Sequence, residues 1–275
     1  MHVDGHLCFL AADRVVRRFE LGCGGRVVGQ AEFIVGRLKQ YPILGWTSTR
    51  ASLLFEYVGV IAILGFIAAA CATVAFFEIA DEIGVSESLS AFDVALSESL
   101  RRWVSREVLE LFALITRLGD VEVLFGISLV VLTVLILQRR WLLSAGWAIA
   151  AASGGLLNRL LKSIFERTRP VHDHGLIAET NWSFPSGHAS GSLLIFGLLT
   201  YLLVRHVRRP LHLPISLLGM TIVVFVGSSR VVLNVHYFSD VLAGFVSAAA
   251  WVAISIAALE TIDRRIAHRS NTQIG

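Results

Sequence analysis

Three short polar segments in the second half of the chain contain the side chains that could do chemistry. They are residues 162–170, which read K-S-I-F-E-R-T-R-P, residues 185–188, which read P-S-G-H, and residues 229–240. Cations beside imidazoles are a combination suited to phosphoryl transfer, because the cations bind phosphate oxygens and the imidazoles can attack or transfer protons. The candidates among them are three cations, two histidines and one aspartate: Lys162, Arg169, Arg230, His188, His236 and Asp240.

The P-S-G-H segment runs directly into an apolar stretch and is expected to begin a helix. Pro185 fixes its own φ and has no N–H, which suits a helix start, and Ser186 can cap the helix. Gly187 allows a ligand to approach the backbone closely. His188 is then expected in the first helical turn, where free N–H groups and the positive end of the dipole favour an anion. A histidine there is a candidate proton donor to a phosphate ester.

The third segment places His236 and Asp240 four residues apart, so on a helix they share a face. The carboxylate can accept one ring N–H, orient the imidazole and leave the other nitrogen free as a nucleophile. His188 then remains as the acid that protonates the leaving oxygen. Lys162, Arg169 and Arg230, completed by the backbone amides of Ser186 and Gly187, would stabilise an in-line phosphoryl transfer without a metal.

Each of these features also has a purely structural interpretation. A single arginine at the end of a membrane span is commonly an interface anchor, and a His–Asp pair four residues apart is commonly a structural hydrogen bond. A Pro-Ser-Gly turn before a helix is also common. The combination favours catalysis, because all six side chains are expected on one face of an otherwise weakly charged protein.

The elements that position these residues are expected to be membrane-spanning helices. Of the 275 residues, 55% are hydrophobic and 16% are charged, against about 25% charged in an ordinary soluble domain. The net charge of +3 comes from basic residues in short clusters between apolar runs, so nucleic-acid binding is not expected. The cysteines are Cys8, Cys23 and Cys71, none of them in a CxxC pair or in a segment expected outside the cell, so neither a disulfide nor a zinc site is indicated.

Six apolar runs are long enough, alone or with interfacial residues, to cross a bilayer. The fold class predicted from them is all-α, a polytopic membrane bundle of about six transmembrane helices with both termini on the same side. The runs are residues 58–77, 123–137, 142–161, 189–204, 213–228 and 241–259.

The basic residues orient this bundle. By the positive-inside tendency, the side of the membrane that carries the basic clusters is the cytoplasm. The chain is therefore expected to be an integral plasma-membrane protein with both termini in the cytoplasm. Residues 78–119, 162–188 and 229–240 then face outward, and the candidate active site faces the outside or periplasm. The basic clusters on the inner side are Arg14, Arg17 and Arg18; Arg139 and Arg140; Arg205, Arg208 and Arg209; and Arg264, Arg265 and Arg269.

The remaining segments are less informative. Residues 1–55 are expected to be a cytoplasmic tail of unknown role, 56–260 the membrane domain, and 261–275 a second cytoplasmic tail. Residues 91–117 have the pattern of one amphipathic helix in the interfacial plane on the outer face. That helix either packs against the bundle or guides lipid substrates to the site. The loop 171–181, with its histidines expected at the surface, indicates no function.

The three segments resemble the signature of the type 2 phosphatidic acid phosphatase superfamily, whose lipid phosphate phosphatases share their site with vanadium haloperoxidases. The family pattern is K-x6-R-P, then P-S-G-H, then S-R-x5-H-x3-D, and residues 162–170, 185–188 and 229–240 match all of it. One departure is Thr168, where many relatives have proline, and residues 1–50 have no counterpart. The resemblance implies phosphate binding by Lys162, Arg169, Arg230, Ser186 and Gly187 and no metal or other cofactor.

The resemblance also implies roles and an activity. His236 would form a phosphohistidine, Asp240 would orient it, and His188 would be the general acid. The implied substrates are lipid phosphates or pyrophosphates at the outer leaflet, of the undecaprenyl pyrophosphate, phosphatidylglycerophosphate, phosphatidate or diacylglycerol pyrophosphate class. Two alternatives stay open: phosphotransfer to a hydroxyl at the same site, and anion transport. The sequence leaves the preferred lipid and the oligomeric state undetermined.

Overall fold

The structure, a computed structural model, describes residues 60–85, 87–171, 174–177 and 179–272, and all regular structure in these ranges is helical. Contacts within the chain divide it into Met1–Glu56 and Tyr57–Gly275, and every described residue lies in the second unit. The N-terminal tail predicted over residues 1–55 lies outside the described residues. The prediction of an all-α membrane bundle is confirmed for the part that is described.

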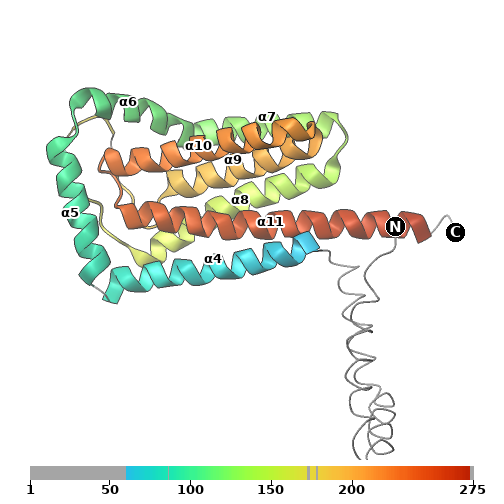
Figure 1. Cartoon of the computed structure of the whole chain (residues 1–275), viewed down its shortest axis with the longest axis horizontal. Helices are drawn as coiled ribbons and strands as arrows, with labels where there is room; N and C mark the ends of the chain where they lie inside the picture. Colours follow the sequence, from blue (N-terminus) through green and yellow to red (C-terminus); the bar gives the residue numbers. More distant parts are fainter. Residues whose placement is uncertain (1–59, 86, 172–173, 178, 273–275) are drawn as a thin grey trace, which may run out of the picture. The chain divides into compact units, whose positions relative to one another are not determined.

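Long helices lie side by side and one helix crosses their ends (Figure 1). The crossing helix, α5, joins the end of α4 to α6, at the end of the unit where α10 turns back into α11. Two 3-10 turns, η1 (Arg117–Gly119) and η2 (Arg209–Leu211), precede α7 and α10. The α-helices are α4 (Val60–Val85), α5 (Glu87–Trp103), α6 (Arg106–Thr116), α7 (Val121–Leu137), α8 (Trp141–Phe165), α9 (Gly187–His206), α10 (His212–Val232) and α11 (Phe238–Thr272).

Five of the six predicted spans coincide with helices that are long and apolar enough to cross a membrane. These candidate spans are Ala62–Gly84, Arg106–Leu137, Gly187–His206, Arg209–Val232 and Phe238–Ile262. The sixth prediction, residues 142–161, falls on α8, a helix of 25 residues in which glycine, serine and asparagine dilute the apolar side chains. The count of six is therefore confirmed only in part. Helix α11 continues to Thr272, through most of the segment expected as a C-terminal tail.

The single amphipathic helix expected over residues 91–117 is wrong, because the chain forms two helices there. Ser105 has the extended backbone of an N-cap (φ −74°, ψ 161°) and starts α6 afresh. Helix α6 continues through η1 into α7 as part of one candidate span. Helix α5, which is in none of the candidate spans, keeps the amphipathic character expected of an interfacial helix, and its last residue, Trp103, is 85% exposed.

Apolar side chains both fill the interior and cover the outside of the bundle. One core cluster lies between α7, α8, α9, α10 and α11 and includes Trp147, Leu194 and Leu198. Many large apolar side chains on the helices are exposed, Phe66 and Phe125 among them. An apolar exterior on long helices is what a lipid environment requires, since a soluble protein rarely exposes such large apolar patches.

Candidate active site

The three polar segments meet at the end of the bundle that α5 crosses. The Ser186 N–H donates to the Asp240 carbonyl at 2.9 Å, which joins the second segment to the third. Arg169 Nη1 donates to the Val235 carbonyl at 2.7 Å, which joins the first to the third. Lys162 Nζ, in the last turn of α8, donates to the carbonyls of Trp182 and Ser183. The third segment is therefore bonded to each of the other two, and the first segment is bonded to the residues that lead into the second.

The P-S-G-H segment is held by aromatic packing and by a helix cap. Phe184 is almost fully buried, with its ring 5.0 Å from that of Phe165 and 5.6 Å from that of Phe76. Ser186 is the N-cap of α9 and its hydroxyl accepts from the Ala189 N–H at 3.5 Å. His188 thus lies in the first helical turn, as expected, while Pro185 lies before the cap. Since the Ser186 amide is bonded to Asp240, phosphate binding by the Ser186–Gly187 backbone stays a prediction.

His236 lies between a carboxylate and a guanidinium. Its Nδ1 is 3.4 Å from Asp240 Oδ2, and its Nε2 is 2.9 Å from Arg169 Nη1. A carboxylate only accepts and a guanidinium only donates, so Nδ1 carries the hydrogen and Nε2 offers its lone pair. The side chain is 2% exposed, and this burial lowers the pKa of His236 to about 3. The imidazole is therefore neutral near pH 7.

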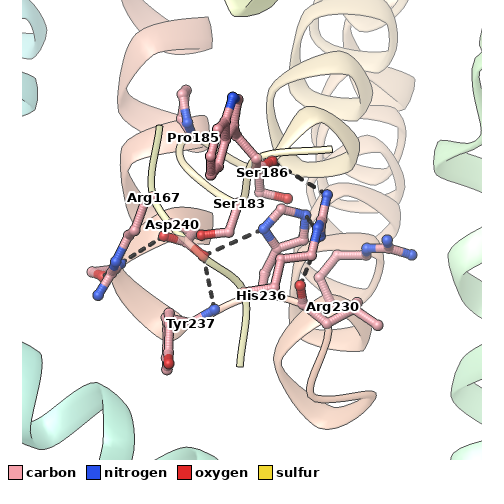
Figure 2. Close-up of polar contacts among 12 residues, drawn as sticks. Arg167, Ser183, Pro185, Ser186, Arg230, His236, Tyr237 and Asp240 are labelled. Carbon is pink, nitrogen blue, oxygen red and sulfur yellow. Dashed lines mark hydrogen bonds and ion pairs between the residues drawn. The ribbon is translucent and has the colours of Figure 1, made fainter. Parts of the chain in front are cut away.

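Asp240 is itself held on both oxygens. Its Oδ2 accepts the Tyr237 N–H at 2.9 Å, and its Oδ1 accepts from Arg167 Nη1 at 2.6 Å. Figure 2 shows Asp240 between Arg167 on one side and His236 on the other. No role was expected for Arg167 from its place in the sequence.

His188 has a carboxylate partner of its own. Its Nε2 lies 2.9 Å from Asp120 Oδ1, so Nε2 carries the hydrogen and donates it. Asp120 is the N-cap of α7, yet its side chain makes no capping bond. Gly119 makes room for this pair, because a Cβ there would lie 2.9 Å from His188 Cδ2. In the sequence, Asp120 lies just before the apolar run 123–137, and no role in the site was expected for it.

Arg169 and Arg230 share one carboxylate, that of Glu179. Arg169 Nη2 donates to Glu179 Oε2 at 3.2 Å, and Arg230 Nη2 donates to Glu179 Oε1. Burial alone would raise the pKa of Glu179, but Arg230 and Arg169 outweigh it and lower that pKa. An ionised carboxylate thus bridges two of the three cations expected to bind phosphate.

Arg230 is nearly fully buried at the end of α10. Its Nη1 donates to Thr116 Oγ1 at 2.8 Å, while its Nε has no hydrogen-bond partner among the described residues. A buried guanidinium N–H without a partner costs free energy unless a ligand fills the position.

The loop before α9 is more involved in the site than the sequence indicated. His174, expected at the surface, is half-buried, and its Nε2 donates to the Leu233 carbonyl at 2.8 Å. His172 lies outside the described residues. Across the described part of the chain, no group of three or more His, Cys, Asp or Glu side chains is placed to hold a metal ion.

Comparison with known proteins decides the family. A family model described as the PAP2 superfamily matches residues 141–264, from α8 into α11, and this range contains all three polar segments. The chain belongs to the PAP2 superfamily. The resemblance drawn from the three segments is confirmed.

Two curated PAP2 relatives align with about a third of the chain. Phosphatidylglycerophosphatase B of Bacillus subtilis is 39% identical over 98 residues, which cover 33% of this chain and 45% of that protein. Lipid A 1-phosphatase of Rhizobium etli is 32% identical over 99 residues, which cover 33% of this chain and 39% of that protein. The matches thus span less than half the length of either relative.

A solved structure extends the likeness across most of the PAP2 fold. The crystal structure of a transmembrane PAP2 type phosphatidylglycerolphosphate phosphatase from Bacillus subtilis has a TM-score of 0.63 and 27% identity, and covers 68% of this chain and 94% of its own. With the candidate spans, this likeness makes the chain a multi-pass integral membrane protein. The family model begins at residue 141, so Asp120 and Thr116 lie outside its match.

Proposed function

We propose that this protein is a phosphatase that removes a phosphate group from a lipid phosphate or pyrophosphate through a phosphohistidine on His236. The observation that carries the proposal is the setting of that imidazole: Nδ1 faces Asp240, and Nε2 offers its lone pair beside Arg169. A neutral imidazole oriented by a carboxylate and surrounded by cations is equipped to attack phosphorus.

The proposed reaction has two displacements at phosphorus. In the first, His236 Nε2 bonds to phosphorus, the bond from phosphorus to the lipid oxygen breaks, and His188 gives that oxygen a proton. In the second, water gives a proton to His188 and attacks the phosphohistidine, the P–N bond breaks, and inorganic phosphate leaves. Asp240 stabilises the positive imidazolium ring of the intermediate, and Asp120 holds His188 in place.

Phosphate binding requires the contacts between the arginines and Glu179 to change. Arg169 and Arg230 pair with Glu179 in this structure, so phosphate oxygens must take the place of the Glu179 carboxylate to reach both guanidinium groups. Arg169 must also withdraw from His236 Nε2 to free the lone pair. The unpartnered Nε of Arg230 supports this assignment, because phosphate oxygens would supply the acceptor that it lacks.

The substrate class is supported by the two curated relatives. Their names specify phosphatidylglycerophosphate and the 1-phosphate of lipid A, which share a phosphate monoester on a lipid. We therefore place phosphatidylglycerophosphate first among the substrates for this chain. Phosphatidate and undecaprenyl pyrophosphate, implied by the motifs, are the comparison substrates.

The test is phosphate release from these three lipids in detergent by the parent and by His236→Ala. We expect the substitution to lower kcat by at least about a thousandfold, since no other group replaces a covalent nucleophile. Acid-quenched parent protein should carry radiolabelled phosphate on histidine, and His236→Ala should carry none. Parental turnover by a folded His236→Ala variant would refute the mechanism. Phosphate release in proportion to lipid consumed, with hydroxyl acceptors present, separates hydrolysis from phosphotransfer.

A further inference from the structure

Helix α5 contributes a buried carboxylate that the proposed mechanism has not used. Asp93 is 1% exposed, although it lies on the helix that crosses the end of the bundle and outside the residues matched by the family model. A buried carboxylate is costly unless cations or donors surround it. Its partners therefore indicate what it does.

One partner of Asp93 is the first turn of α11. Asp93 Oδ1 accepts the Ser239 N–H at 3.1 Å, and Oδ2 accepts from the Ser239 hydroxyl. The N–H groups of a first helical turn have no acceptor within their own helix, so Asp93 serves as a cap supplied by another helix. The rings of Phe92 and Phe238 meet edge to face at 5.9 Å beside this contact. Helix α5 thus fixes the start of the helix that carries Asp240.

The other partner is Arg167, which joins Asp93 to Asp240. Arg167 Nη2 donates to Asp93 Oδ2 at 2.9 Å, and its Nη1 donates to Asp240 Oδ1 at 2.6 Å. The guanidinium carbon lies 4.4 Å from the centroid of the Tyr237 ring, which restrains the side chain further. Burial would lower the pKa of Arg167, but Asp240 and Asp93 outweigh it and raise that pKa.

We propose that Asp93 and Arg167 are positioning residues for the nucleophile, holding the Asp240 carboxylate so that Oδ2 faces His236 Nδ1. The inference rests on the proposed function. Arg167 fixes Oδ1, which prevents the carboxylate from turning away from the imidazole. Asp93 anchors the far side of Arg167 and offsets its charge. The two carboxylates and one guanidinium carry a net charge of −1, so negative charge remains to stabilise the imidazolium ring.

The test is a kinetic comparison of Asp93→Asn with Glu98→Gln. Glu98 is the matched control, because it is an exposed carboxylate on the same helix. We expect Asp93→Asn to lower kcat for phosphatidylglycerophosphate by about 10- to 100-fold, as weakened orientation of a catalytic group does, with KM within about twofold. Glu98→Gln should keep the parental values. In an Asp240→Asn background, Asp93→Asn should cause no further loss of kcat.

Two results would contradict a positioning role for Asp93. Parental kcat for a folded Asp93→Asn variant, or an equal loss of kcat in the parent and in the Asp240→Asn background, would show that Asp93 only holds α5 in place. If Asp93→Asn does not fold, Arg167→Lys serves instead, since an ammonium cannot bond both carboxylates in the same geometry. It should lower kcat about tenfold, and parental kcat would overturn the inference. If His236→Ala remains active, the proposed function fails; if His236→Ala is inactive and Asp93→Asn has parental kcat, only the positioning role fails.

Discussion

Lys162 differs from the two arginines of the site because its charge changes near neutral pH. Burial lowers its pKa to about 8, and the neighbouring Arg169 lowers it in the same direction. Below pH 8 the side chain is an ammonium that can pair with phosphate, and above pH 8 most of it is a neutral amine. Arginine guanidinium groups stay protonated throughout this range.

We expect phosphate binding to weaken as pH rises through about 8. Between pH 7 and pH 9 the protonated fraction of Lys162 falls from about nine-tenths to about one-tenth, so kcat/KM should fall by up to about tenfold. A phosphate monoester is already a dianion over this range, because its second pKa is about 6. The measurement is a pH profile of kcat/KM for phosphatidylglycerophosphate. Lys162→Arg should be flat from pH 7 to 9, and the same alkaline fall in that variant would exclude Lys162 as its origin.

At the residue scale, the motif side chains and the pairing of His236 with Asp240 could be predicted from the sequence, but the partners that lie outside the motif positions could not. Glu179 lies in an irregular loop, where no periodicity shows which way a side chain points. Arg167 stands two residues before Arg169, and the sequence does not show which of the two contacts Asp240 and which contacts His236. Asp93 gave one usable signal: it shares a helix face with Leu96 and Leu100, and a carboxylate on an apolar face needs a buried partner.

At the scale of elements, the site depends on how closely α11 approaches the start of α9. Gly244 lies at this crossing, where an added Cβ would be 2.7 Å from the Ser186 carbonyl oxygen. The obstructing atom belongs to the backbone, so it cannot move aside as a flexible side chain would. Ser186 and Asp240 are joined at the same crossing by a backbone hydrogen bond.

We expect Gly244→Ala to push α11 away from the P-S-G-H turn, which should lower stability by about 1–3 kcal/mol, as overpacking does, and reduce kcat together with it. Gly126→Ala in α7 is the control, because a Cβ there has nothing within 4 Å and the alanine favours the helix. Thermal unfolding in detergent and phosphate release measure the two effects. Equal melting temperatures for the two variants would contradict the packing argument.

Helices defined by hydropathy alone could be predicted from the sequence. The composition of α8, which helix packing determines, and the break between α5 and α6 could not. The long apolar runs gave five candidate spans correctly. Helix α8 is less apolar because helix packing selects small residues in it: a Cβ on Gly154 would lie 2.3 Å from Leu194 Cδ2. The break between α5 and α6 at Ser105 interrupts an amphipathic pattern that continues on both sides, so periodicity could not locate it.

At the scale of the whole molecule, the order of helices determines which connections share a side. The three polar segments and α5 lie at one end of the described unit, and the connection between α7 and α8 lies at the other (Figure 1). We keep the orientation predicted from the basic residues, with the polar segments outside the cell and the α7–α8 connection in the cytoplasm. The positions of the basic clusters favour this orientation over its inverse.

Single cysteines in a variant lacking Cys8, Cys23 and Cys71 test this orientation. In intact cells, a membrane-impermeant maleimide should label Trp103→Cys, at the exposed end of α5. It should leave Arg140→Cys, in the α7–α8 connection, unlabelled until the cells are opened. The reverse pattern would invert the protein in the membrane, and labelling of both positions in intact cells would contradict the assignment of these connections to opposite sides.

The bridge that Glu179 makes between Arg169 and Arg230 has a consequence for turnover. Under the proposed function, a tethered carboxylate is an internal competitor whose local concentration never changes, however little substrate the membrane contains. It weakens the affinity for lipid substrate and for inorganic phosphate alike. Because this competition weakens only the binding of the ground state, it does not slow the chemical step. The loop before α9 would then help to expel the product, because the departing phosphate leaves behind cations that already have a counter-ion within reach.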